Sequence, residues 1–243
     1  MKKVRVGILC QQNHKLDSYH IHTFQRLFDS EFLDVVVKVY DGRADFRRKH
    51  IPFWRIISKA IMKSQLLFER IIFSKSIRHE NKSAVLKKLD QVPAISLNPI
   101  TKGFRDYFTE DIVTPLLDFD IDVLLRYEFG IISGDILTLP KYGIWSFHHG
   151  DNDINRGGPA GFWEARNKEA YVGATLQKLS DSLDGGDIID KMYYHVSPSY
   201  FLNNKEVRLA SIEILIKNLR LLSMGRFQVE SSKVYFNPLY RSP

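Results

Sequence analysis

The feature that most constrains the fold is an opening alternation of two short apolar runs around a segment with helical spacing. Residues 4–9 (VRVGIL) and 33–39 (LDVVVKV) are rich in β-branched side chains, which predicts two buried strands. The stretch from about 19 to 29 between them predicts a helix. This order indicates a βαβ unit with parallel strands. The turn QQNHKLDS after the first strand lacks Gly-x-Gly-x-x-Gly, so the dinucleotide-binding fingerprint is absent.

The same type of pattern continues along the chain. Further strands are predicted at 92–97, 121–125, 144–147 and 172–179, with a returning strand after Gly185-Gly186, and helices at about 162–167 and 205–222. We therefore expect an α/β fold with a Rossmann-like, mainly parallel twisted sheet flanked by helices. It would occupy residues 1–200 and carry a helical insertion at about 42–90. Residues 201–243 would form a C-terminal helix followed by a small β extension.

The expected insertion is basic and amphipathic. In residues 52–75, apolar side chains recur at helical spacing and alternate with Arg55, Lys59, Lys63 and Arg70. Such a helix can lie on a membrane surface as a peripheral contact, or it can pack on its own domain with a solvated basic face. The sequence leaves both interpretations open.

Composition sets the cellular context. The 243 residues carry a formal net charge of +7, which suits anionic partners but also occurs without one. The lone cysteine, Cys10, excludes a disulfide within the chain and favours a reducing compartment. The N-terminus lacks the long apolar segment of a signal peptide, and no run of 18 apolar residues exists. We expect a cytoplasmic protein, and its oligomeric state stays open.

The loop WSFHHGDNDINRGGPAGFWE (145–164) holds the strongest sign of chemistry. His148 follows a predicted strand, where catalytic groups of α/β sheets commonly lie, and an imidazole there can move a proton. Asp184, in LDGGD, is the candidate partner that would orient it. A metal site would use His148, His149, Asp151 and Asp153. However, adjacent histidines point to opposite faces of a strand, so no metal is expected. Hydrogen bonding within the loop is the remaining alternative.

These residues resemble a known family. GIWSFHHGDNDINRGGPAGFWEA and VGATLQKLSDSLDGGDII are similar to the formyltransferases that use 10-formyltetrahydrofolate, which act on methionyl-tRNA, glycinamide ribonucleotide or nucleotide-linked amino sugars. In that family a strand ending Asn-x-His precedes an Arg/Lys-Gly loop, a Gly-x-Thr strand and an Asp-x-Gly loop. This chain has Ser146-Phe147-His148, Arg156-Gly157, Gly173-Ala174-Thr175 and Asp184-Gly185-Gly186 in the same order. The resemblance extends from about residue 121 to residue 190.

The resemblance implies that His148 is the general acid and base and that Asp184 holds it. The family's asparagine donates a hydrogen bond to the oxyanion, a role whose loss typically costs on the order of 2.7–4 kcal/mol. Ser146 replaces that asparagine. Three outcomes are open: Ser146 acts through a water molecule, His149 supplies the donor, or formyl transfer is lost.

The resemblance also implies binding segments. The pterin of 10-formyltetrahydrofolate would lie between two backbone segments: Phe129, Gly130, Ile131 and Ile132 on one side, and Ser180, Asp181 and Leu183 on the other. Arg156, Gly157, Gly158, Phe162 and Trp163 would shape the acceptor side. An Arg-Gly segment followed by Pro and Phe-Trp favours an amino sugar, free or nucleotide-linked.

The expected function is transfer of a formyl group from 10-formyltetrahydrofolate to the primary amine of a small molecule, with no nucleic acid partner. One alternative is a formyltetrahydrofolate hydrolase. Such hydrolases usually carry an extra N-terminal domain, whereas this chain begins with its first strand. The other alternative is a catalytically altered protein of the same fold that binds a ligand or partner.

Overall fold

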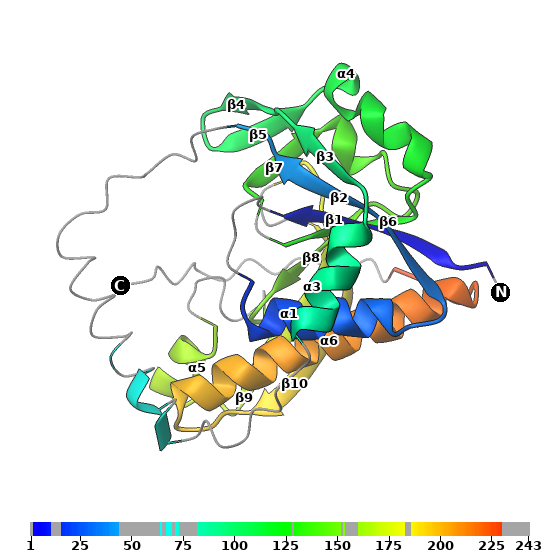
Figure 1. Ribbon diagram of the computed structural model, residues 1–243. Helices are drawn as coiled ribbons and strands as arrows, with labels where there is room; N and C mark the ends of the chain where they lie inside the picture. The colour runs from blue at the N-terminus through cyan, green and yellow to red at the C-terminus, as the bar shows by residue number, and fades with distance from the viewer. Residues whose placement is uncertain are drawn as a thin grey trace.

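The computed structural model describes residues 2–10, 16–43, 64, 67–69, 71–72, 82–127, 129–151, 153, 160–182 and 186–229 (Figure 1). The strands are β1 (Val4–Cys10), β2 (Leu33–Asp41), β3 (Ala94–Leu97), β4 (Ile100–Lys102), β5 (Arg105–Phe108), β6 (Val123–Arg126), β7 (Ile131–Gly134), β8 (Ile144–His148), β9 (Tyr171–Lys178) and β10 (Asp187–His195). The helices are α1 (Ser18–Phe28), α3 (Lys82–Gln91), α4 (Glu110–Val113), η2 (Thr114–Phe119), η3 (Asp135–Leu137), α5 (Phe162–Arg166) and α6 (Tyr200–Ser223).

The main sheet has seven strands in the order β10-β9-β8-β6-β1-β2-β3. All neighbours from β8 to β3 pair in parallel, while β9 and β10 pair antiparallel. The prediction of a Rossmann-like, mainly parallel sheet is confirmed. Parallel strands place their carboxyl ends at one edge, so the ends of β1, β6 and β8 meet there.

Helices α1, α3 and α6 lie together on one face of this sheet (Figure 1). Their apolar residues form one core with Val6, Val123, Trp145 and Leu176 of the strands. Helix α6 begins at Tyr200, five residues before the predicted start. The reason is Ser199, whose Oγ accepts a hydrogen bond from the backbone N–H of Leu202 and caps the helix.

The opposite face carries a second core and a small sheet that the sequence did not predict. This sheet has the order β4-β5-β7, with β4 and β5 antiparallel and β5 and β7 parallel. Phe108, Leu116, Phe129 and Ile136 pack from this side against the main sheet. The small sheet therefore lies beside the turn that follows β6.

The predicted insertion at 42–90 is described only in part. Its last section is α3, a helix between β2 and β3 that buries Val85 against the core. Glu69 is buried, and its Oε2 accepts hydrogen bonds from Ser199 Oγ and the N–H of Phe201, each at 2.7 Å. Leu67, Phe68, Ile71 and Ile72 are exposed.

The rest of the predicted amphipathic helix at 52–75 lies outside the described residues, as does most of the predicted β element of the tail, from residue 230 on. No helix in the described part of the chain combines the length and apolar character needed to cross a bilayer.

Candidate active site

The predicted catalytic residues on and directly after β8 lie on two faces of the main sheet. The side chains of β8 alternate, so Trp145 and Phe147 face α1 and α6, whereas Ser146 and His148 face the small sheet. Ser146 pairs with Arg126 of β6 and Gln177 of β9, and His148 pairs with Thr175 of β9. Ser146 is buried and His148 is half-buried. The structure therefore brings Ser146 and His148 together on one face.

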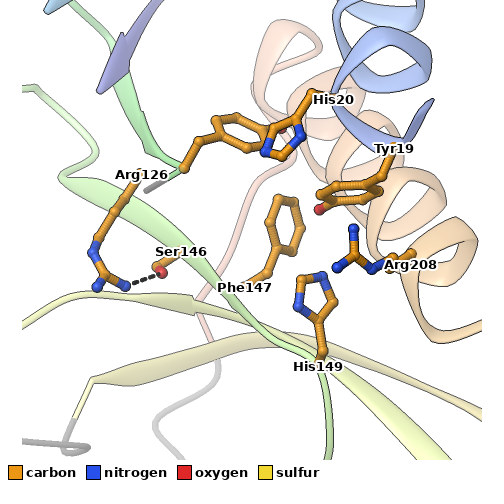
Figure 2. A pocket seen from close by; sticks show the side chains of 8 residues that line it. Tyr19, His20, Arg126, Ser146, Phe147, His149 and Arg208 are labelled. Atoms are coloured by element: carbon orange, nitrogen blue, oxygen red, sulfur yellow. Dashed lines mark hydrogen bonds between the residues drawn. The ribbon is translucent and has the colours of Figure 1, made fainter. Parts of the chain in front are cut away.

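Arg126 connects this face to the predicted folate segment. Its guanidinium donates to Ser146 Oγ at 3.2 Å, to the carbonyl oxygen of Phe129 at 2.7 Å and to that of Gly130 at 3.2 Å. Carbonyl oxygens only accept, so one cation fixes both the turn after β6 and the serine of β8. Figure 2 shows Arg126 and Ser146 on one side of the strand, away from Phe147 and His149.

Arg105 of β5 joins the two predicted folate segments. It pairs with Ile131 in the small sheet, and its Nη1 donates to Ser133 Oγ at 3.4 Å and to the carbonyl oxygen of Asp181 at 2.8 Å. The Asp181 carboxylate lies 3.5 Å from the same nitrogen. The loop that contains Ser180 and Asp181 is thus held beside β7.

The segment 129–132 carries no polar side chain, so its polar groups are backbone N–H and C=O, of which the carbonyl oxygens of Phe129 and Gly130 accept from Arg126. Phe129 and Ile132 are buried in the second core, and Phe129 packs on Phe108 with ring centroids 5.9 Å apart. At Gly130, a Cβ would lie 2.3 Å from an oxygen of Asp106, so a larger residue would displace that carboxylate. A backbone wall of this type can read the hydrogen-bonding edge of a flat heterocycle.

A cavity of about 160 Å³ opens at the carboxyl ends of β6 and β8 (Figure 2). It is lined by Tyr19, His20, Arg126, Tyr127, Ser146, Phe147, His149 and Arg208. His149 stands edge-on to Tyr19 and stacks on Phe147. Among the described residues, Tyr19 Oη, His149 Nε2 and Arg208 Nε are buried without a hydrogen-bond partner. Three such atoms around one cavity indicate a site for a polar ligand or ordered water.

Asp17 pairs with two residues that line this cavity, His20 and Arg208. Burial alone would raise the pKa of the Asp17 carboxyl, but hydrogen bonds from His20 and the charge of Arg208 hold it well below its usual range. Arg208 Nη1 donates to Asp17 Oδ2 at 2.9 Å, and His20 Nδ1 lies 2.7 Å from Oδ1. Burial, with the charge of Arg208, lowers the pKa of His149 to about 3. His149 is therefore a neutral imidazole at physiological pH.

Asp151 and Asp153, the two carboxylates considered as metal ligands, both accept hydrogen bonds from a lysine. Lys191 Nζ donates to Asp151 Oδ1 at 2.7 Å and to Asp153 Oδ2 at 2.5 Å, and Tyr193 Oη donates to Asp151 Oδ2 at 2.8 Å. Although burial opposes it, the Lys191 ammonium lowers the pKa of Asp151. This network ties the loop after β8 to β10. The described residues contain no group of three or more potential metal ligands.

The remaining predicted residues divide into two groups. Phe162 and Trp163 lie on α5, where Phe162 packs edge-on against Tyr200, and they do not line the cavity. The others lie outside the described residues: Arg156, Gly157, Gly158, Leu183 and Asp184.

Several residues of this site were not predicted from the sequence: Tyr19, Arg105, Arg126 and Arg208. Of these, Arg126 could have been identified from the sequence. It directly follows the strand predicted at 121–125, at the edge where catalytic groups gather. The other three come from a helix or a short strand with no local motif.

Sequence relatives point to the same family as the site. A methionyl-tRNA formyltransferase of Prochlorococcus marinus is 29% identical over 146 residues, which is 59% of this chain and 42% of that protein. Over this region the chain is similar in sequence to methionyl-tRNA formyltransferases. No family model matches it. The aligned region spans less than half of the curated relatives it matches.

Solved structures of formyltransferases have the same fold as this chain. Phosphoribosylglycinamide formyltransferase of Anaplasma phagocytophilum superposes with a TM-score of 0.59 and 14% identity, covering 99% of this chain and 100% of that one. An N-formyltransferase of Helicobacter canadensis was solved with folinic acid and dTDP-3-aminofucose. It superposes with a TM-score of 0.52 and 13% identity, covering 99% of this chain and 71% of that one. The seven-stranded, mostly parallel sheet with flanking helices is the fold they share.

Proposed function

We propose that this protein transfers the formyl group of 10-formyltetrahydrofolate to the primary amine of a small polar acceptor, an amino sugar or a nucleotide-linked amino sugar. The observation that carries the proposal is the shared position of Ser146 and His148 on one face of β8, joined through Arg126 to the backbone at Phe129 and Gly130. The proposed proton-transfer residue would then lie on the same face of β8 as the residue that Arg126 connects to the proposed folate segment.

The chain's residues fit the folate donor. Arg105 pairs with Ile131 and holds the loop of Ser180 and Asp181 beside β7. Formyl-folate supplies an activated one-carbon carbonyl when bound. The protein's part is then to orient that carbonyl, exclude water and move protons.

In the proposed mechanism, His148 accepts a proton as the acceptor nitrogen bonds to the formyl carbon. It returns a proton to the folate nitrogen as the bond between that nitrogen and the formyl carbon breaks. The Asp184 carboxylate would hold the imidazole and stabilise its charged form. Ser146 would donate a hydrogen bond to the formyl oxygen while that oxygen carries negative charge.

The cavity supports a polar acceptor. Tyr19 Oη, His149 Nε2 and Arg208 Nε surround it and can bond to hydroxyl groups or to an anionic group. The N-formyltransferase of Helicobacter canadensis, which shares the fold, was solved with a nucleotide-linked amino sugar. We therefore place the acceptor on the α1 and α6 side of β8, with its amine at the carboxyl end of the strand. Arg156, Gly157, Gly158, Phe162 and Trp163 remain the proposed acceptor-binding residues.

The test is a transfer assay in which 10-formyltetrahydrofolate is the donor in four parallel reactions. Three of them contain dTDP-3-aminofucose, phosphoribosylglycinamide or initiator methionyl-tRNA as the acceptor, and the fourth contains no acceptor. Mass spectrometry detects the N-formyl product, and absorbance follows tetrahydrofolate. We expect a formylated amino sugar. Formate released without any acceptor would identify a hydrolase. Absence of both turnover and folate binding would identify a catalytically altered protein and overturn the proposal.

A further inference from the structure

Ser146 is a weaker oxyanion donor than an amide unless something fixes its hydroxyl group. A serine hydroxyl rotates about its C–O bond, so its hydrogen has no set direction. Preorganised donors are effective because they need no reorientation during the reaction. Whether Ser146 can serve therefore depends on what surrounds its oxygen.

Arg126 provides that constraint. The two residues face each other on neighbouring parallel strands, and the Arg126 Nη1–H donates to Ser146 Oγ at 3.2 Å. The serine hydrogen cannot point at the cation that already donates to its oxygen, so it is directed away from the guanidinium. Accepting a hydrogen bond from a cation also makes the serine O–H a stronger donor. Ser146 is buried and lines the cavity, where little bulk water competes for this hydrogen.

The guanidinium is itself held in place. Its Nε and Nη2 donate to the carbonyl oxygens of Gly130 and Phe129, so the plane of the group is fixed by the turn after β6. The three contacts of Arg126 therefore connect Ser146 of β8, the proposed oxyanion donor, with residues 129 and 130, the proposed folate-binding turn. A rigid, planar, permanently charged group suits this role better than a flexible amine.

We infer that Arg126 is the positioning residue that makes the Ser146 hydroxyl a fixed hydrogen-bond donor to the formyl oxygen. The pair would do together what the family's asparagine amide does alone. This inference rests on the proposed formyl transfer. It differs from the simpler role of closing the turn at residues 129–130, which would require Arg126 but not Ser146.

The experiment is a double-mutant cycle on the full chain, with Arg126→Met, Ser146→Ala and both together. Activity is formylation of dTDP-3-aminofucose or, if that reaction is absent, whichever acceptor in the assay above is formylated. We expect each single variant to lower kcat about 10²-fold, as for loss of one oxyanion donor. The KM for 10-formyltetrahydrofolate should change less than about threefold. The double variant should be no slower than either single variant, because both remove the same donor.

A second arm uses Ser146→Asn, alone and with Arg126→Met. The asparagine amide carries its own directed N–H donors, so kcat should become insensitive to residue 126. Arg126→Lys should recover part of the activity. Arg5→Met is the matched control, because Arg5 Nε also donates to two carbonyl oxygens, those of Phe119 and Asp120, at the amino end of β1. It should leave kcat unchanged.

The outcomes separate two failures. If the wild-type protein formylates none of the acceptors, the proposed function fails and the inference fails with it. If the wild type is active but the losses from Arg126→Met and Ser146→Ala multiply in the double variant, the inference alone is wrong. The same conclusion follows if Arg126→Met raises KM and leaves kcat intact, since Arg126 then supports only the turn. Thermal melts of each variant identify any that do not fold. If Arg126→Met is one of them, Arg126→Lys takes its place in the cycle, and kcat losses that multiply with Ser146→Ala would again contradict the inference.

Discussion

His148 and His149 are consecutive in the chain but point to opposite sides of the main sheet. His148 shares its face with Ser146, and His149 lies against Tyr19 in the cavity beside α1 and α6. Because one imidazole is on the proposed folate side and the other on the proposed acceptor side, their substitutions should have different effects.

His148→Ala should lower kcat for formyl transfer by about 10² or more, as for loss of a general base. His149→Gln should instead raise the KM for the acceptor, with kcat within about tenfold of the wild type. Steady-state kinetics with each substrate varied in turn measures both. Equal kcat losses in the two variants would contradict the assignment of the two faces.

His149 should also make stability depend on pH. Its pKa in the folded protein is about 3, against an ordinary value of 6.5. An unfolded chain then binds a proton that the native imidazole does not. The free energy of unfolding from this residue is fully present above pH 6.5 and falls as the pH is lowered toward 3. The slope is at most about 1.4 kcal/mol per pH unit.

Urea denaturation at pH 7.5, 6.5, 5.5 and 4.5 measures that slope. His149→Gln should reduce it, so that the gap between variant and wild type changes with pH only below about 6.5. Parallel stability curves for the two proteins would show that His149 titrates normally.

Lys191→Met should destabilise the protein by about 2 kcal/mol, because it leaves the Asp151 and Asp153 carboxylates without their shared cation. The loop after β8 should loosen with it, and kcat should fall. Lys217→Met is the control: its ion pair with Asp190 is solvent-exposed on the lysine side and should be worth less than about 1 kcal/mol. Thermal denaturation of both variants makes the comparison, and similar shifts would refute the role of Lys191.

Arg105→Met should weaken binding of folinic acid at least about tenfold. The substitution removes the charged donor that holds the Asp181 loop beside β7. Isothermal calorimetry gives the dissociation constant without turnover. Lys102→Met, on the neighbouring strand, is the control, since Lys102 lies over the ring of Tyr107 outside this loop. Unchanged affinity in Arg105→Met would remove the loop from the folate pocket.

Glu69→Ala should cost about 1 kcal/mol of stability, in the range found for lost helix caps. Its carboxylate accepts from Ser199 Oγ and the Phe201 N–H at the start of α6. Hydrogen exchange of residues 200–203 should speed up in the variant, while residues 212–219 in the middle of the helix keep their protection. Unaltered exchange at 200–203 would contradict the contact.

The parallel core of the fold was predictable because its strands are buried on both faces. Runs such as 4–9 and 33–39 are mostly apolar and rich in β-branched side chains, with Arg5, Asp34 and Lys38 as the charged exceptions. The small sheet was not predictable. Ile100–Lys102 and Arg105–Phe108 are only three and four residues long, which is too short for a hydrophobic period to be recognised in the sequence.

The candidate site was also predictable from the sequence only in part. His148 could be found because a histidine directly after a buried strand is a local pattern. Arg105 could not, since its role comes from reaching a carbonyl oxygen 76 positions away in the chain. Arg208 likewise acts on Asp17 across 191 positions. Long side chains that bond to distant residues leave no signature in their own neighbourhood.

Glu69 has a consequence for how the molecule is assembled during synthesis. The helix turn it caps is made 130 residues later, after every strand of the main sheet has been synthesised. Until then this carboxylate has no helix end to hold, and the inner surfaces of β8 and β9 have no α6 to cover them. Docking of α6 therefore covers these strands and gives the buried glutamate its hydrogen-bond donors at the same time.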